Sequence, residues 1–123
     1  MKKVLSIGQC DADNQRIGKM LNSNFSIEFA TANDRRDAIP KLKNQNFDLV
    51  IVNRILDSNG DEGMDIIRDL KSDGNFKKTP VMLVSNFKDA QESAVSIGAE
   101  PGFGKATLDE ETTLNMLKRY LEN

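Results

Sequence analysis

The chain has 123 residues, the size of one ordinary domain, and its 17 Lys and Arg nearly balance its 19 Asp and Glu, for a formal charge of −2. This balance argues against a nucleic-acid-binding protein, which normally carries a basic excess. The sequence contains no histidine and a single cysteine, Cys10. It therefore excludes Ser-His-Asp and Cys-His catalysis, a histidine-containing metal site and an intrachain disulfide.

No apolar run approaches the ~20 residues that a membrane span requires. The run Val4–Ile7, which follows Lys2 and Lys3, is too short for the apolar part of a signal peptide. We therefore expect a cytoplasmic protein with no membrane and no nucleic-acid partner. Because no linker, internal repeat or low-complexity segment interrupts the chain, we expect one domain over residues 1–123.

Short apolar runs alternate with longer segments of helical spacing. The runs are Val4–Ile7, Phe25–Phe29, Leu49–Val52, Val81–Val84 and a weak fifth run around Phe103. In the longer segments, apolar residues recur three or four positions apart: Ile17, Met20 and Leu21; Ile39 and Leu42; Met64, Ile66, Ile67 and Leu70; Leu114, Leu117 and Leu121. The alternation predicts an α/β fold, a doubly wound five-stranded parallel sheet with helices on both faces.

Helix caps and a site follow from this arrangement. Asp11 and Asp13 are placed to cap the first helix, and Asn33 and Asp34 precede the second. In an open parallel sheet, ligands bind beyond the carboxyl ends of the strands. The candidate site therefore comprises the segments that follow the first, third, fourth and fifth strands: Gly8–Asp11, Asn53–Asp57, Ser85–Asn86 and Lys105–Ala106.

Three segments at these positions resemble the receiver domains of two-component response regulators: Phe47–Asn53, Pro80–Asn86 and Gly98–Lys105. The resemblance covers essentially the whole chain except residues 57–62, where the loop is about two residues longer than usual. It implies a flavodoxin-like receiver fold with strand order 2-1-3-4-5. It also implies a role in phosphorelay signal transduction as a signalling domain and not as an enzyme.

The resemblance assigns roles to five positions. A receiver accepts a phosphoryl group on an aspartate, with Mg²⁺ held by oxygen ligands that include two acids after the first strand. Those two acids correspond here to Gly8 and Gln9, and the phosphoacceptor corresponds to Asn53. The hydroxyl residue and the lysine that contact the phosphoryl oxygens are retained as Ser85 and Lys105.

An amide cannot form an acyl phosphate, and the matched positions carry one positive charge and no negative charge. We therefore expect no catalytic residue and no Mg²⁺ or other cofactor. The aromatic residue that reorients on activation in the family corresponds to Gly102, while strand alternation should turn Phe103 to the opposite face. Gly102 and Gly104 would let the fifth strand pass close to its neighbours.

The leading hypothesis is a stand-alone pseudo-receiver, a phosphorylation-independent protein-interaction module. Its partner would be a histidine kinase, an effector or a second copy of the chain. The family's usual interaction surface corresponds to Phe87–Ala99 and Lys105–Tyr120. Two alternatives stay open: a working receiver phosphorylated on Asp57, and an anion or small-ligand sensor that uses Ser85 and Lys105.

Overall fold

The computed structural model describes residues 1–122, which form a five-stranded parallel sheet. Its strands are β1 (Lys2–Ile7), β2 (Ile27–Ala32), β3 (Leu49–Asn53), β4 (Val81–Val84) and β5 (Glu100–Phe103). Its helices are α1 (Asp11–Asn24), α2 (Arg35–Asn44), α3 (Gly63–Ser72), α4 (Lys88–Ser96), the 3₁₀ turn η1 (Lys105–Thr107) and α5 (Glu111–Leu121). The strand order is β2-β1-β3-β4-β5, which confirms the predicted receiver topology.

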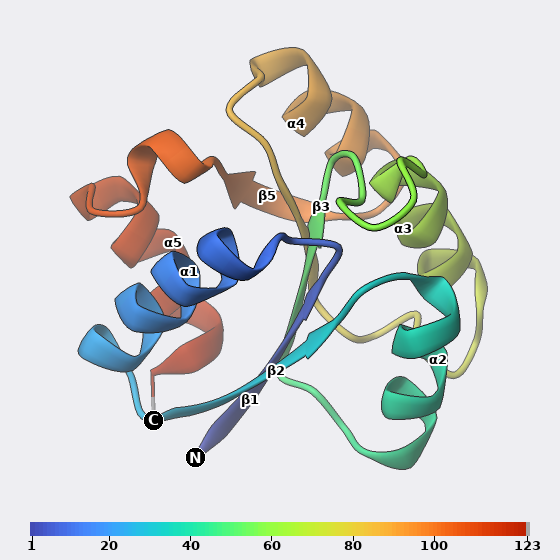
Figure 1. The fold of residues 1–123 in the computed structure, drawn as a ribbon, viewed down its shortest axis with the longest axis horizontal. Coiled ribbons are helices and arrows are strands. Elements are labelled where there is room, and N and C mark those ends of the chain that lie inside the picture. Colours follow the sequence, from blue (N-terminus) through green and yellow to red (C-terminus); the bar gives the residue numbers. More distant parts are fainter. Residues whose placement is uncertain (123) are drawn as a thin grey trace.

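Helices cover the sheet on both faces, with α1 and α5 on one side and α2, α3 and α4 on the other (Figure 1). Successive residues of β3 alternate between the two layers. Leu49 and Ile51 pack with α1 and α5, whereas Val50 and Val52 pack with α2 and α3, and all four are fully buried. A strand buried on both faces needs apolar residues at every position, which explains the continuous apolar runs in the sequence.

The second strand lies later in the chain than predicted. It spans Ile27–Ala32 and not Phe25–Phe29, because Phe25 is the C-cap of α1 and donates its backbone N–H to the Leu21 carbonyl oxygen at 2.8 Å. β2 is an edge strand in which Glu28 and Thr31 are exposed. Its apolar signal is therefore weaker and less well bounded than that of the central strands.

The cap of the first helix also differs from the prediction. Cys10, and not Asp11 or Asp13, occupies the N-cap position of α1, and its Sγ accepts a hydrogen bond from the Asp13 N–H at 3.4 Å. Asp11 and Asp13 lie in the first turn instead. The prediction for the second helix is confirmed, since the Asp34 side chain accepts from the Asp37 N–H at 3.0 Å. Among residues 1–122, no helix is long and apolar enough to cross a membrane.

Candidate functional site at the carboxyl edge of the sheet

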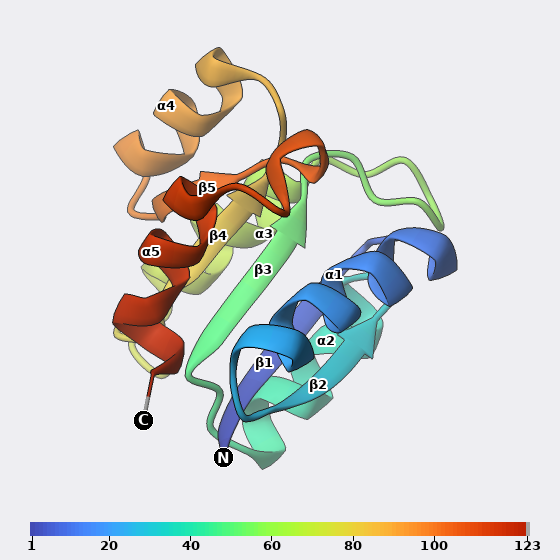
Figure 2. The same ribbon diagram turned by 90° about the vertical axis from the view of Figure 1, so that its left-hand side faces the viewer.

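The parallel strands end at one edge of the sheet (Figure 2), and the segments predicted to form the site follow the ends of β1, β3, β4 and β5. Asn53 is the last residue of β3, and its Nδ2 donates to the Gly8 carbonyl oxygen at 3.0 Å. Lys105 follows β5, and its Nζ lies 3.4 Å from the Asn53 Oδ1. The topology therefore brings together residues as far apart in the sequence as Gly8 and Lys105, because parallel strands all end at one edge.

A hollow of about 160 Å³, here called the central hollow, opens beside the ends of β3 and β4. Its lining includes the predicted site residues Asn53, Ser85 and Lys105, together with Arg54, Ile55, Val84, Asn86 and Phe87. Gly102 does not border it. Gly102 lines a neighbouring hollow of about 280 Å³ that extends from Ser85 and Asn86 toward α5.

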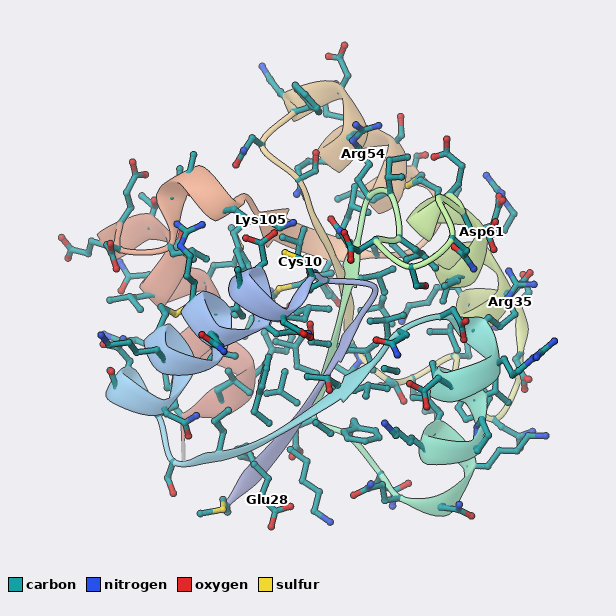
Figure 3. The ribbon with its side chains drawn as sticks, in the orientation of Figure 1. Cys10, Glu28, Arg35, Arg54, Asp61 and Lys105 are labelled. Atoms are coloured by element: carbon teal, nitrogen blue, oxygen red, sulfur yellow. The ribbon has the colours of Figure 1, made fainter. Side chains whose placement is uncertain are left out.

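The charge of Lys105 is neutralised by an acid outside the family pattern. Its Nζ lies 2.7 Å from the Asp13 Oδ2, and each side chain is about a quarter exposed, at 25% and 23%. The hydrogen bond from Lys105 lowers the pKa of the Asp13 carboxyl below its usual 3.8, and burial opposes this effect only in part. The positive charge predicted for the matched positions is thus offset by Asp13. Figure 3 labels Lys105 at this edge of the sheet.

Arg16 extends this ion pair into a network between α1 and the segment after β5. One guanidinium nitrogen, Nη2, donates to the Lys105 carbonyl oxygen at 3.2 Å, and Nη1 lies 3.7 Å from the Asp13 Oδ1. Lys105 is therefore held through its side chain and through its backbone. Its ammonium group points to the start of α1, where it contacts Asp13 at 2.7 Å. Its contact with Asn53 is longer, at 3.4 Å.

Leu56 occupies the space beside Gly8. A Cβ atom added to Gly8 would lie 2.2 Å from the Leu56 Cδ2 and 3.3 Å from the Leu56 Cα. Leu56 is fully buried, and the loop that carries it is fixed to β1, because the Asp57 N–H donates to the Gly8 carbonyl oxygen at 2.9 Å. Gly8 also has a φ of 82°, a conformation that favours glycine. The side chain of Asp57 is exposed on the same loop.

The residues at the family's metal positions do not fit Mg²⁺, a hard cation that prefers carboxylate oxygens. Gly8 offers no side chain, and Leu56 presents an apolar group in its place. Gln9 is buried, at 3% exposure, and its amide has no hydrogen-bond partner in the described part of the chain. Asn53 offers one neutral oxygen, which already contacts Lys105. Among residues 1–122, no three His, Cys, Asp or Glu side chains are grouped as a metal site.

Ser85 and Asn86 serve the local loop structure. The Ser85 Oγ accepts from the Phe87 N–H at 3.1 Å, and the Asn86 Oδ1 accepts from the Ala106 N–H at 3.0 Å. A Cβ atom added to Gly104 would lie 1.9 Å from that same Oδ1. The prediction that this glycine allows close approach to a neighbouring strand end is confirmed, and Asn86 is the residue that approaches.

Arg54 and Phe87 form the outer wall of the central hollow. The Arg54 guanidinium carbon lies 5.1 Å from the centre of the Phe87 ring, in the geometry of a cation–π contact. The Phe87 side chain is 60% exposed, and Figure 3 shows Arg54 between β3 and α4. This pair places the remaining positive charge of the hollow at its rim, next to the start of α4.

No family model matches the sequence, and no curated protein is significantly similar to it. Solved structures are similar over nearly the full length. The chemotaxis protein CheY4 of Vibrio cholerae is 24% identical, with a TM-score of 0.78 and coverage of 98% of this chain and 99% of that chain. The signal receiver domain of a DNA-binding response regulator from Colwellia psychrerythraea 34H is 22% identical, with a TM-score of 0.81 and coverage of 97% of both chains.

The chain has the receiver fold. A third structure with this fold is the beryllofluoride-activated NtrC4 receiver domain dimer, with 21% identity, a TM-score of 0.80 and coverage of 99% of this chain and 98% of that chain. Asn53, the residue predicted to correspond to the phosphoacceptor, is the last residue of β3.

Two residues have roles at the site that the sequence did not predict. Leu56 lies within the predicted segment Asn53–Asp57 but had no role assigned to it, and the ion-pair partner Asp13 lies outside the predicted segments. Leu56 lies in a loop longer than the family pattern, so no matched position pointed to it. Asp13 was assigned only to a helix cap. A signal for it did exist, because the first turn of a helix that follows β1 lies at the same edge of the sheet as Lys105.

Proposed function

We propose that this chain is a pseudo-receiver, a phosphorylation-independent protein-interaction module of two-component signalling, and not an enzyme. One observation carries the proposal. Asn53, the residue at the phosphoacceptor position, uses both polar atoms of its side-chain amide in contacts within the chain. Its Nδ2 donates to the Gly8 carbonyl oxygen, and its Oδ1 contacts the Lys105 ammonium group. Such an amide is not a nucleophile for phosphorus, and it forms part of the internal hydrogen bonding of the loops.

The Leu56–Gly8 contact and the Lys105–Asp13 ion pair support the same proposal. The first places an apolar side chain where a metal ligand would stand, and the second engages the lysine that would contact a phosphoryl oxygen. Phosphoryl transfer depends on a metal or a cation to neutralise the transferred group. In this chain Leu56 fills the space of a metal ligand, and Lys105 is already paired with Asp13.

The partner would be a signalling protein, a histidine kinase or effector in the cytosol, or a second copy of the chain. We place the interaction surface on α4 and α5, over residues 87–99 and 105–120. Two exposed apolar side chains of the α4 region, Phe87 and Val95, favour this surface, at 60% and 43% exposure. The NtrC4 receiver is a dimer, which makes self-association of this chain a specific case to test.

The test is incubation with acetyl phosphate and Mg²⁺, followed by intact mass measurement. We expect the mass of the unmodified chain. A stoichiometric phosphoryl adduct would overturn the proposal, and the variant Asp57→Asn would then show whether the exposed loop carboxylate is the acceptor. Sedimentation velocity with and without the donor adds a second readout, because a phosphorylation-independent module keeps the same oligomeric state in both.

The alternative of an anion sensor is tested separately, by thermal unfolding in inorganic phosphate and sulfate. An anion that binds only the folded chain raises its unfolding temperature. Asp13 competes with such an anion for Lys105, since the two side chains already lie 2.7 Å apart. We therefore expect no specific stabilisation, and the Asp13→Asn variant is the one in which an anion would have access to Lys105.

A further inference from the structure

The side chain of Gln91 joins α4 to two strands of the sheet. Its Nε2 donates to the carbonyl oxygens of Leu83 at 2.9 Å and Ser85 at 3.1 Å, with a longer contact to Phe103 at 3.4 Å. Its Oε1 accepts from the Gly102 N–H at 3.0 Å. One amide group therefore contacts the backbone of β4, of β5 and of the segment after β4.

These contacts lie at an interruption of the sheet. β4 and β5 pair at Met82 with Glu100 and at Val84 with Phe103, so β5 has one more residue than β4 between the two pairs. Such a β-bulge leaves the backbone of the extra residue without a ladder partner. Here the Gly102 N–H finds its partner in the Gln91 side chain.

Gly102 leaves the room that this arrangement needs. A Cβ atom added to it would lie 2.2 Å from the Leu83 carbonyl oxygen and 3.0 Å from the Gln91 Oε1. The backbone of β4 and the Gln91 amide thus fill the space beside this position. The aromatic side chain that the receiver family carries at this position could not be placed here without moving Gln91 or β4.

α4 buries fewer residues than α3, although Ala90 and Ile97 at its two ends also pack against the core. Ala94 is the only buried residue among its nine, whereas α3 buries Gly63, Ile66, Ile67 and Leu70. No side chain caps the N-terminus of α4. The hydrogen bonds of Gln91 therefore supplement a small apolar contact in fixing the position of this helix.

We propose that the hydrogen bonds of Gln91 hold α4 in one position on β4 and β5, so that the exposed surface of α4 keeps one conformation without an activating signal. The inference extends the proposed function, because a module that is not switched by phosphorylation must present its partner surface without a trigger. It rests on hydrogen bonds that do not involve Asn53, and its test uses neither a phosphodonor nor a metal. A failure of one proposal is therefore distinguishable from a failure of the other.

The test is amide hydrogen exchange and relaxation dispersion on the ¹⁵N-labelled chain, with Gln91→Ala as the first variant. We expect the Gly102 amide to exchange at least about tenfold faster than in the wild type, since it loses its acceptor. We also expect microsecond-to-millisecond exchange at the amides of α4, with β1 and β3 unchanged. Unaltered protection of Gly102 would overturn the proposal.

Gln91→Glu separates hydrogen bonding from simple filling of space. A carboxylate of nearly the same size still accepts from the Gly102 N–H but cannot donate to Leu83 or Ser85. We expect α4 to be mobile at neutral pH and to regain order at acidic pH, where the protonated side chain again has a donor. Wild-type behaviour of this variant at neutral pH would contradict a donor role. Glu92→Gln, an exposed change one residue away, is the matched control and should leave Gly102 protected.

Discussion

Lys105 lies 2.7 Å from Asp13, an acid in the first turn of α1, and 3.4 Å from Asn53 at the end of β3. The short contact thus goes to a residue outside the receiver pattern. In consequence the retained lysine acts as a structural link between α1 and the segment that follows β5. Arg16 reinforces that link through the Lys105 carbonyl oxygen.

The ion pair predicts a pH dependence of stability. The pKa of Asp13 is lowered in the folded chain, chiefly by the hydrogen bond from Lys105, so its ionised form stabilises the fold. That contribution is complete above the unfolded-state pKa and is lost as the pH falls through the lower folded-state pKa. We expect Asp13→Asn to reduce the free energy of unfolding by roughly 1 kcal/mol at neutral pH and by much less at about pH 2.

Urea unfolding at the two pH values measures this difference. Asp11→Asn is the control, because Asp11 lies in the same turn of α1, is exposed and forms no salt bridge within residues 1–122. A loss for Asp13→Asn that is equal at both pH values would show that its charge is not the source of the stabilisation.

A carboxylate at position 53 alone should not make the chain accept a phosphoryl group. Asn53→Asp supplies a carboxylate, but Gly8 and Gln9 still lack the charge that holds Mg²⁺. We expect no stoichiometric adduct with acetyl phosphate and Mg²⁺ by intact mass. A magnesium-dependent adduct on this single variant would show that the acids after β1 are dispensable here.

Leu56 should act as a further block. A triple variant with Gly8→Asp, Gln9→Asp and Asn53→Asp has the full acid set, yet the new side chain at position 8 meets Leu56. Adding Leu56→Ala should therefore increase phosphoryl incorporation, although removal of a buried leucine costs about 2–5 kcal/mol of stability. Circular dichroism checks that each variant is folded, and equal incorporation in both variants would exclude a blocking role for Leu56.

Gly102 should not tolerate a side chain. In Gly102→Ala the new methyl group would lie 2.2 Å from the Leu83 carbonyl oxygen, which is backbone and cannot rotate away. We expect a loss of about 1–3 kcal/mol in the free energy of unfolding. Gly74→Ala is the matched control, because no atom lies within 4 Å of its added Cβ and its φ is not positive. A near-neutral Gly102→Ala would contradict the close packing of β5 on β4.

Phe87 should matter little for stability. Phe87 is 60% exposed, and its ring makes a cation–π contact with the Arg54 guanidinium. We expect Phe87→Ala to change the free energy of unfolding by at most about 1 kcal/mol. A larger loss in urea unfolding would show that the ring supports the fold and is not kept exposed for a partner.

The sequence predicted the central strands because Leu49–Val52 of β3 and all of β4 are apolar residues buried on both faces. β2 was misplaced because an edge strand with Glu28 and Thr31 exposed has a weaker pattern. The topology then placed Asn53, Ser85 and Lys105 around one hollow, as strand order alone requires.

Specific contacts between distant segments could not be predicted from the sequence. The pairing of Lys105 with Asp13 depends on the direction of a flexible side chain, and the contact of Leu56 with Gly8 depends on the path of a lengthened loop. The fit of Gln91 to the bulge at Gly102 depends on a register shift between β4 and β5. None of these geometries follows from residue spacing along one segment.

The most direct measurement of the central claim is a pair of ¹H–¹⁵N spectra, recorded without and with Mg²⁺ and beryllofluoride. Beryllofluoride is the activator named for the NtrC4 receiver, and here it reports on whether the pocket accepts a phosphoryl mimic. The account predicts unchanged amide resonances for Asn53, Ser85 and Gly102 and throughout α4. Saturable shifts of these resonances that require both Mg²⁺ and beryllofluoride would contradict it.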